Sequence, residues 1–218
     1  MDTSFISQSL PLFAKATWLT LVLSFFGVVF SIVVGTFCAI INFYKIPVLR
    51  RIVYAYIEVA RNTPLIVQLF FLYYALPRLG MVLDGKTCAV VGLTFLGGAY
   101  MAEAIRSGLQ SVGRTQIETG MSLGFGKIKL MRYIIIPQAL AVALPVISAT
   151  TIFLMKETSV VSIVALHDLL YVAKDLLKEG HALQSNLMLV VCYLILILPV
   201  SLGFSYLERR SRFAGFGA

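Results

Sequence analysis

The chain has 218 residues, of which 59% are hydrophobic and only 13% are charged. Soluble globular domains carry about 25% charged residues and about 45–50% apolar ones. This composition excludes an ordinary soluble domain and favours an integral membrane protein, because a bilayer can cover the apolar surface that a soluble fold cannot hide. The formal net charge of +8 raises the question of where the charges fall.

The N-terminus begins MDTSF, with an acid and no basic n-region. We therefore expect no cleaved signal peptide. Residues 5–15 are predicted to lie along the membrane surface as an amphipathic lead-in to the first span.

Five stretches are apolar and long enough to cross about 30 Å of hydrocarbon as helices. They lie near residues 18–41, 52–76, 89–104, 134–155 and 187–206. The sequence thus predicts an all-α polytopic membrane protein, with residues 1–218 as a single transmembrane domain and a core over residues 18–207.

The basic residues are distributed unevenly between the two sides of these spans. One side holds eleven, in the loop at 45–51, the central loop at 106–132 and the end segment at 209–212, and the other holds six. Cytoplasmic loops carry the Lys/Arg excess. We therefore place the N-terminus outside, the C-terminus and the loop over residues 106–133 in the cytoplasm, and expect no nucleic-acid partner.

The central cytoplasmic loop carries the signals of a short helix. Thr115 and Glu118 have the spacing of a capping box, and Gly124 is well placed to end the helix in the left-handed conformation. The small residues Thr119 and Gly120 would let a partner approach the helix backbone closely. The alternative is an ordinary basic loop without a partner.

A resemblance favours the docking interpretation. The segment is similar to the EAA loop of permease subunits of ABC importers, with the pattern E-A-A-x3-G-x9-I-x-L-P. Glu118, Gly124, Ile134 and Pro137 occupy its fixed positions, whereas Thr119 and Gly120 stand for the two alanines and Ile136 for the leucine. The segments ARNTPLIVQLFFLYYALP (60–77) and PQALAVALP to LMKETS (137–159) resemble the polar amino acid permeases of that group.

The resemblance implies a type I importer permease fold, and it implies several partners. The ATPase-coupling residues would be Glu118, Thr119, Gly120, Gly124 and Pro137. The partners would be a cytoplasmic ABC ATPase dimer, a second copy or a homologous permease, an extracellular or periplasmic amino-acid-binding protein, the amino acid and membrane lipid. ATP and magnesium would be bound by the ATPase, and no cofactor by this chain.

Ionisable residues inside a membrane indicate a functional site. Glu58 and Arg61 are three residues apart on the second predicted span, so they share a helix face and could pair. Pro64 should kink this helix and free carbonyl groups near residue 60. Thr63 and Gln68 complete a polar face that either lines the substrate pathway or holds a structural ion pair.

A second polar group follows the fourth predicted span. Lys156 and Glu157, with the hydroxyl of Thr158, could bind the carboxylate and the ammonium of an amino acid. The alternatives are that Lys156 pairs with Glu157 as a gate, or that both extend to the membrane interface. The apolar segment after them is interrupted and is predicted to form a broken helix on the outer side.

No catalytic, nucleotide or metal site is predicted. The segment GFGKIK fails the P-loop pattern at Met121 and Ile128, the three cysteines are scattered, and His167 and His181 are expected at the surface. The resemblance implies the membrane subunit of an ATP-driven importer for a polar amino acid in the bacterial inner membrane. The alternatives are an ion-coupled transporter protomer and a membrane scaffold that transports nothing.

Overall fold

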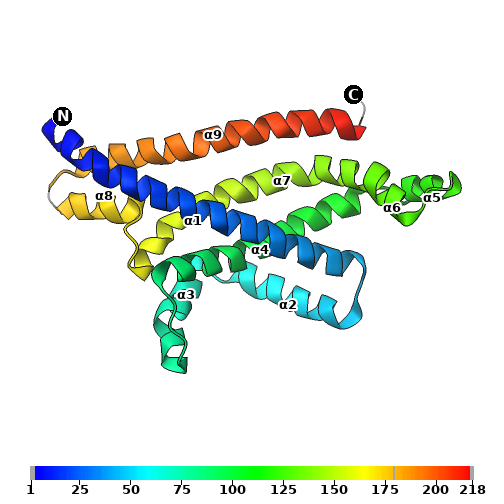
Figure 1. The fold of residues 1–218 in the computed structure, drawn as a ribbon, viewed down its shortest axis with the longest axis horizontal. Helices are drawn as coiled ribbons and strands as arrows, with labels where there is room; N and C mark the ends of the chain where they lie inside the picture. The colour runs from blue at the N-terminus through cyan, green and yellow to red at the C-terminus, as the bar shows by residue number, and fades with distance from the viewer. Residues whose placement is uncertain (1–2, 179, 217–218) are drawn as a thin grey trace.

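The structure, a computed structural model, describes residues 3–178 and 180–216, and within these residues the regular elements are all helical (Figure 1). The longer helices are α1 (Thr3–Phe43), α2 (Pro47–Asn62), α4 (Gly85–Ser111), α5 (Arg114–Ser122), α7 (Ile136–Glu157), α8 (Leu169–Lys178) and α9 (Ala182–Phe216). Short helices and turns connect them: α3 (Leu65–Phe70), η1 (Phe71–Ala75), η2 (Leu76–Leu79), α6 (Lys127–Leu130), η3 (Met131–Ile135) and η4 (Thr158–Val164).

Within the described residues, four helical runs are long and apolar enough to cross a membrane. They cover Phe5–Phe43, Gly85–Ser111, Lys127–Val164 and Ala182–Ser211. Each contains one of the predicted spans and extends beyond it, which confirms four of the five.

The second predicted span is not one continuous helix, and the interruption expected at Pro64 is confirmed. The chain over residues 52–76 breaks at Thr63, whose backbone is extended (φ −113°, ψ 129°), and restarts as α3. Pro64 causes the break, because a proline lacks the N–H that would continue the helix and forces the preceding residue out of helical geometry. Only the short apolar run Leu65–Leu79 follows.

The expected surface lead-in at residues 5–15 is also wrong, because these residues continue directly into α1. Phe5 and Phe13 are buried, and they belong to a cluster with residues of α8 and α9, among them Leu169 and Ala173. This apolar packing draws the N-terminal turns of α1 onto the rest of the bundle beside α8 (Figure 1).

Helix α4 lies at the centre of the bundle, between α1, α2 and α7. Small residues make this possible, because they let helix backbones approach closely where no hydrophobic driving force acts between helices. A Cβ added at Gly108 would lie 2.3 Å from the carbonyl oxygen of Ala139 on α7. A Cβ at Gly35 of α1 would lie 2.5 Å from Cβ of Met101 on α4.

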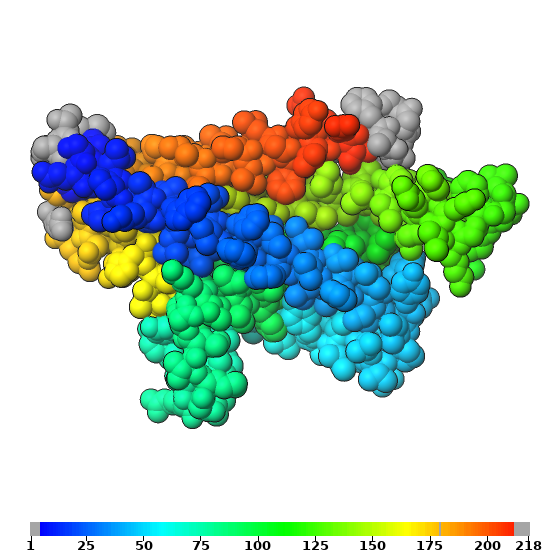
Figure 2. Space-filling model, in the orientation of Figure 1, coloured from blue at the N-terminus to red at the C-terminus, as the bar shows by residue number. Residues whose placement is uncertain are grey.

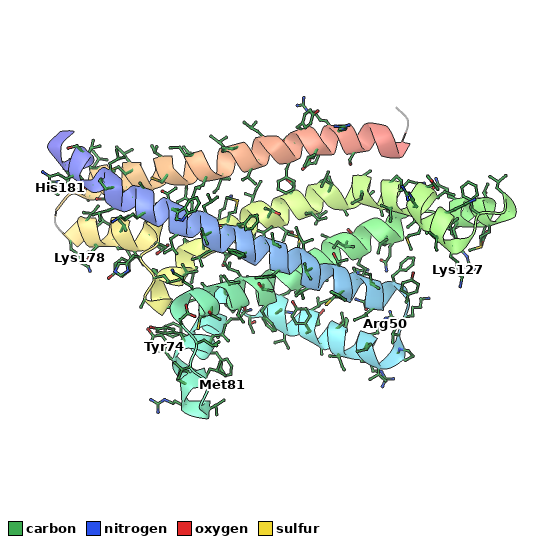
Figure 3. The ribbon with its side chains drawn as sticks, viewed as in Figure 1. Arg50, Tyr74, Met81, Lys127, Lys178 and His181 are labelled. Atoms are coloured by element: carbon green, nitrogen blue, oxygen red, sulfur yellow. The ribbon has the colours of Figure 1, made fainter. Side chains whose placement is uncertain are left out.

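The two ends of the bundle differ in the way that the charge pattern predicts. Arg50 and Lys127 lie at one end, whereas Lys178 and His181 lie at the other (Figure 3). The basic loop at 45–51 and the central loop therefore share a side, and the positive-inside rule makes that side cytoplasmic. The C-terminal part of α9 runs to the same end (Figure 1).

Candidate functional site

The central loop forms α5, which begins earlier than expected. The capping box predicted at Thr115 is wrong: the N-cap is Gly113, in an extended conformation, so Thr115 is already inside the first turn. Glu118 caps nothing; its Oε1 instead accepts a hydrogen bond from Nε of Arg114 at 3.1 Å. The carboxylate thus stabilises the helix through an exposed i,i+4 pair, which contributes only a few tenths of a kcal/mol.

The end of α5 confirms the prediction for Gly124. Its φ of +79° lies in the left-handed region. The N–H of Gly124 donates to the carbonyl of Met121 at 2.9 Å, and the N–H of Phe125 donates to that of Gly120 at 3.0 Å. These two bonds form a Schellman motif, in which glycine at this position satisfies the last carbonyl groups of the helix without steric cost.

The role predicted for Gly120 is wrong. Gly120 is buried inside the loop, and a Cβ added there would lie 2.6 Å from Cδ1 of both Leu130 and Ile134. The small residue therefore serves the close packing of α5 on the chain that leads into α7, and it is not open to a partner. Thr119, its neighbour, is exposed.

Pro137 stands at the start of α7, directly after a π-helical turn, η3. The proline ring would clash with the carbonyl group four residues earlier in a regular helix, and the wider turn relieves this clash. The same arrangement recurs where η1 precedes Pro77. Pro137 thus sets the direction in which the loop joins the membrane helix.

The exposed surface of the loop includes large apolar side chains among its polar residues. Met121, Leu123 and Ile128 are 56%, 71% and 83% exposed, although they lie in a loop with basic residues. The loop projects from one end of the molecule (Figure 2). Exposed apolar residues grouped at a projecting tip are typical of an interaction surface.

At the break between α2 and α3, Gln68 bridges the two helices. Its Nε2 donates to the carbonyls of Ala60 at 3.2 Å and Thr63 at 3.1 Å, and to Oγ1 of Thr63 at 2.9 Å. The Thr63 hydroxyl in turn donates to the carbonyl of Val59 at 2.8 Å. The carbonyl groups that Pro64 was predicted to free near residue 60 are thus satisfied by a side chain of the next helix.

A cleft of about 430 Å³, here called the inner cleft, opens beside this break. Its lining includes Arg61 and Thr63 from the end of α2, Glu157 from the last turn of α7, and the aromatic residues Tyr100 and Phe153. The guanidinium of Arg61 lies 5.3 Å from the centre of the Tyr100 ring. One cation, one carboxylate, a hydroxyl and two aromatic rings therefore line the same small space.

Three expectations for these residues need correction. Arg61 does not pair with Glu58, which instead accepts a hydrogen bond from Nδ2 of Asn62 at 3.2 Å, one turn along α2. Lys156 is exposed and does not line the inner cleft, because adjacent residues face different sides of a helix. Thr158 is buried, and its Oγ1 donates to the carbonyl of Met155 at 2.7 Å.

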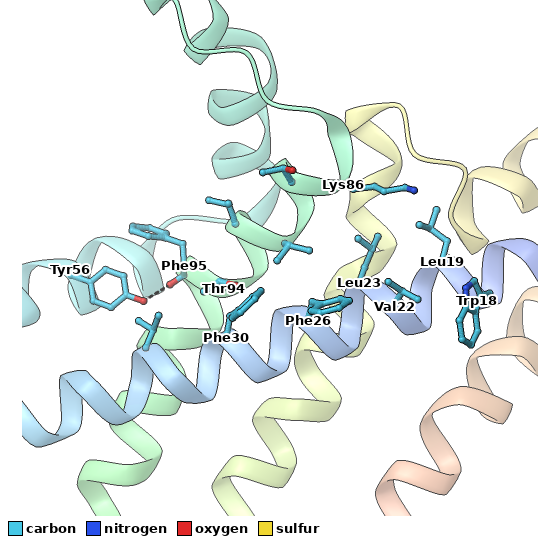
Figure 4. A pocket seen from close by; sticks show the side chains of 14 residues that line it. Trp18, Leu19, Val22, Leu23, Phe26, Phe30, Tyr56, Lys86, Thr94 and Phe95 are labelled. Atoms are coloured by element: carbon cyan, nitrogen blue, oxygen red, sulfur yellow. Dashed lines mark hydrogen bonds between the residues drawn. The ribbon is translucent and has the colours of Figure 1, made fainter.

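A larger cavity, of about 1000 Å³, lies between α1 and α4 and has a different character. Most of its lining is apolar, with Phe26, Phe30 and Phe95 prominent (Figure 4). The hydroxyl of Tyr56 donates to the carbonyl of Phe95 at 2.8 Å at one end. This cavity contains none of the predicted pathway residues.

The interrupted outer segment is confirmed as η4 and α8, and it contains a polar residue that the sequence reasoning passed over. Asp168 is fully buried and caps α8, accepting hydrogen bonds from the N–H groups of Leu170 at 3.2 Å and Tyr171 at 3.1 Å. Burial raises the pKa of its carboxyl to about 6 against these hydrogen bonds and the nearby Lys174. An aspartate directly before an apolar helical run is an N-cap signal that could have revealed it.

The comparisons with known proteins agree with this geometry. Residues 27–213 match the family described as the binding-protein-dependent transport system inner membrane component. The chain belongs to this family. It is a membrane-spanning permease subunit of an ABC transporter and not itself an enzyme, since ATP hydrolysis is carried out by a separate subunit, and it is located in the bacterial inner membrane.

Individual relatives cover nearly the whole permease. The probable glutamine ABC transporter permease protein GlnM of Bacillus subtilis (strain 168) is 34% identical, over 96% of this chain and 98% of the relative. The glutamine transport system permease protein GlnP of Escherichia coli (strain K12) is 30% identical, over 97% and 98%.

Solved structures show the same fold. A chain from the crystal structure of an amino acid ABC transporter with histidines superposes with a TM-score of 0.87 at 33% identity, over 96% of this permease and 99% of that chain. A chain of the MetNI methionine ABC transporter in an inward-facing conformation has a TM-score of 0.77 at 21% identity, over 94% and 98%. The predicted type I importer permease fold is therefore confirmed.

Proposed function

We propose that this permease carries a polar amino acid across the membrane, and that the inner cleft is where the chain contacts it. The observation that carries this proposal is the presence of Arg61 and Glu157 in the lining of one small cleft. They come from different helices, so a ligand that bound both side chains would connect α2 to α7.

The chemistry of the cleft suits a zwitterion. A guanidinium presents a planar fork of donors that matches a carboxylate, so Arg61 would hold the carboxylate of the substrate. Glu157 accepts hydrogen bonds and would hold the ammonium group. Glu157 is half-buried, where an uncompensated charge is costly, and a positively charged group of the ligand would compensate it.

The remaining residues have supporting roles in this proposal. Thr63 lines the cleft, and Gln68 fixes the position of Thr63 through its hydrogen bonds. Tyr100 and Phe153, whose ring centres are 5.4 Å apart, would pack against the substrate side chain. Lys156 and Thr158, which were predicted as ligands, are not included because neither lines the cleft. The relatives described as glutamine and amino-acid permeases support this substrate class.

We also propose that the α5 loop transmits the action of a cytoplasmic ABC ATPase dimer. The exposed Met121, Leu123 and Ile128 would fill an apolar groove of the ATPase, with Glu118 and Thr119 at the rim. The buried Gly120, the left-handed Gly124 and Pro137 would keep the loop rigid, so that movement of the ATPase displaces α7 as a body. ATP and magnesium would be bound by the ATPase, and this chain would bind no cofactor.

The further partners follow from the family. A second copy of this chain or a homologous permease would complete the pathway, since the α9 surface is apolar and not covered within the chain. An extracellular or periplasmic binding protein would deliver the amino acid. Membrane lipid would cover the remaining apolar surface, and no nucleic acid would take part.

The experiment that tests the proposed function is uptake into proteoliposomes that contain the complete transporter. Initial rates are measured for the twenty radiolabelled L-amino acids with the parent and with Arg61→Gln. We expect ATP-dependent uptake of at least one polar amino acid, and a loss of about tenfold or more in Arg61→Gln from the missing charge-assisted hydrogen bonds. Arg78→Gln, at an exposed site on η2, is the control. Uptake of no amino acid by the parent would refute the proposed function.

A further inference from the structure

A second cleft, here called the outer cleft, adjoins the inner cleft on the side of η4 and α8. Its volume is about 450 Å³, and its lining is more polar than that of the groove between α1 and α4. Among the polar residues that line it are Ser159 and Ser162 of η4, and Tyr171 and Lys174 of α8. It lies on the part of the molecule that is opposite to the α5 loop, where α8 and Lys178 are found (Figure 3).

The two clefts share a wall. Ile66 of α3 and Val160 of η4 line both of them. These two elements pack against each other. The hydroxyl of Tyr74 in η1, which follows α3, donates to the carbonyl of Ile163 in η4 at 3.1 Å. Ile66 and Val160 therefore lie at the boundary between the outer cleft and the inner cleft.

The outer cleft presents a cation without a strong partner of its own. Lys178 pairs with Asp175, with Nζ 3.1 Å from Oδ1. Lys174 is exposed, and among the described residues it has no ion pair within salt-bridge distance, although it lies near enough to Asp168 to favour the ionised carboxylate. The aspartate itself is buried beneath the helix start and bonded to backbone N–H groups. Lys174 is thus free to meet an anion that enters the cleft.

We propose that the outer cleft is a second subsite for zwitterionic amino acids. It holds the carboxylate at Lys174 with the hydroxyls of Ser159 and Ser162, before the substrate passes between Ile66 and Val160 into the inner cleft. The inference rests on the proposed function, because it takes the same class of substrate. The apolar pair then acts as a barrier that water and ions cross poorly while the substrate waits outside.

The barrier is tested by thiol labelling of the complete transporter in proteoliposomes, without nucleotide, in a background in which Cys38, Cys88 and Cys192 are replaced by alanine. An impermeant, anionic methanethiosulfonate is added on the outer side. We expect Ile163→Cys, in the outer cleft, to react at least about tenfold faster than Asn62→Cys, in the inner cleft, a ratio that corresponds to about 1.4 kcal/mol. Adding Ile66→Ala and Val160→Ala should remove most of this difference. Equal rates at the two positions, or a ratio that the alanine pair leaves unchanged, would overturn the barrier.

The subsite is tested by protection of the Ile163→Cys thiol. The probe is the L-amino acid that the parent transporter takes up fastest among the twenty. Lys174→Gln should raise the half-protecting concentration by about tenfold or more, because one charge-assisted hydrogen bond is lost. Lys174→Arg should keep most of the protection, and Lys86→Gln, an exposed lysine outside both clefts, should not change it.

The outcomes separate the two proposals. In one outcome, the parent takes up amino acid, and the amino acid protects the Ile163→Cys thiol at the same concentration with and without Lys174→Gln. In that case the outer subsite is wrong and the proposed function stands. If the parent takes up none of the twenty amino acids, the proposed function fails first, and the amino-acid subsite falls with it.

Discussion

The side-chain amide of Gln68 donates to Oγ1 of Thr63 at 2.9 Å across the break between α2 and α3. The same nitrogen also donates to the carbonyl groups of Ala60 and Thr63. One side chain therefore supplies the hydrogen bonds to the backbone carbonyl groups that Pro64, which has no N–H, cannot supply. The same side chain connects the end of α2 to the start of α3 beside the inner cleft.

We predict that Gln68→Leu destabilises the permease. The buried carbonyl of Ala60 would lose its side-chain partner, which costs about 1–3 kcal/mol for a buried polar group left unsatisfied. Thermal unfolding of the purified transporter in detergent measures this effect. Gln116→Leu, on the exposed surface of α5, should change stability by less than about 0.5 kcal/mol. Equal unfolding temperatures for the Gln68→Leu and Gln116→Leu variants would contradict the bridging role.

We predict that Gly124→Val weakens the association with the ATPase. A β-branched residue at φ +79° is strained by about 1–3 kcal/mol, so the Schellman motif should open. The measurement is co-purification of the ATPase with the permease, together with uptake. Gly126→Ala is the matched control, because its backbone is extended (φ −68°) and a Cβ there meets no atom within 4 Å. Full co-purification and uptake with Gly124→Val would show that this turn is not needed for docking.

We predict that position 116 is reached by a thiol reagent from the cytoplasmic side only. The α5 loop lies at the same end as Arg50, opposite Lys178 (Figure 3), and the basic excess makes that end cytoplasmic. Gln116→Cys in a background without the native cysteines is labelled in right-side-out and inverted vesicles. Labelling in right-side-out vesicles would reverse the orientation of the whole chain.

We predict that Asp168 makes stability depend on pH. Its pKa is raised from 3.8 in the unfolded chain to about 6 in the folded protein, so the folded state binds the proton more tightly. The contribution to stability is fully present below about pH 4 and is lost as the pH rises to about 6. The groups that interact with it are the N–H groups of Leu170 and Tyr171, the ammonium of Lys174 and the phenol hydroxyl of Tyr193.

The measurement is the unfolding temperature of the parent minus that of Asp168→Asn, between pH 4 and pH 8. The asparagine can still accept hydrogen bonds at the start of α8 but does not titrate in this range. We expect the difference to become less favourable to the parent as the pH rises. A difference that stays constant across this range would show that the carboxyl titrates at the same pH in both states.

Much of the fold could be predicted from the sequence, because long apolar runs and the distribution of Lys and Arg act over whole helices. Four spans and the end of α5 at Gly124 follow from such local signals. The capping box at Thr115 misled because Gly113 could start the helix without a side-chain cap. The role of Gly120 could not be predicted, since it depends on Leu130 and Ile134 folding back over α5.

The candidate site was only half predictable for the same reason. Arg61 and Thr63 were predicted in one polar group and Glu157 in another, but the meeting of the two groups in one cleft depends on how α2 and α7 both pack against α4. Lys156 and Glu157 were predicted to act together because they are adjacent in the chain. Only Glu157 lines the cleft, since adjacent residues on a helix face different sides.

The contrast between Glu157 and Lys156 gives the most direct test of the proposed substrate site. The measurement is the half-saturating concentration and the amino-acid selectivity of ATP-driven uptake, for Glu157→Gln and Lys156→Gln in proteoliposomes with the complete transporter at matched ATPase content. The account predicts that Glu157→Gln lowers the uptake efficiency by about tenfold or more and changes the ranking of acidic, neutral and basic competitors, because the ammonium loses its carboxylate. Lys156→Gln should resemble the parent in both respects. Parent-like uptake and ranking in Glu157→Gln, or an equal effect of the two substitutions, would contradict the placement of the substrate in the inner cleft.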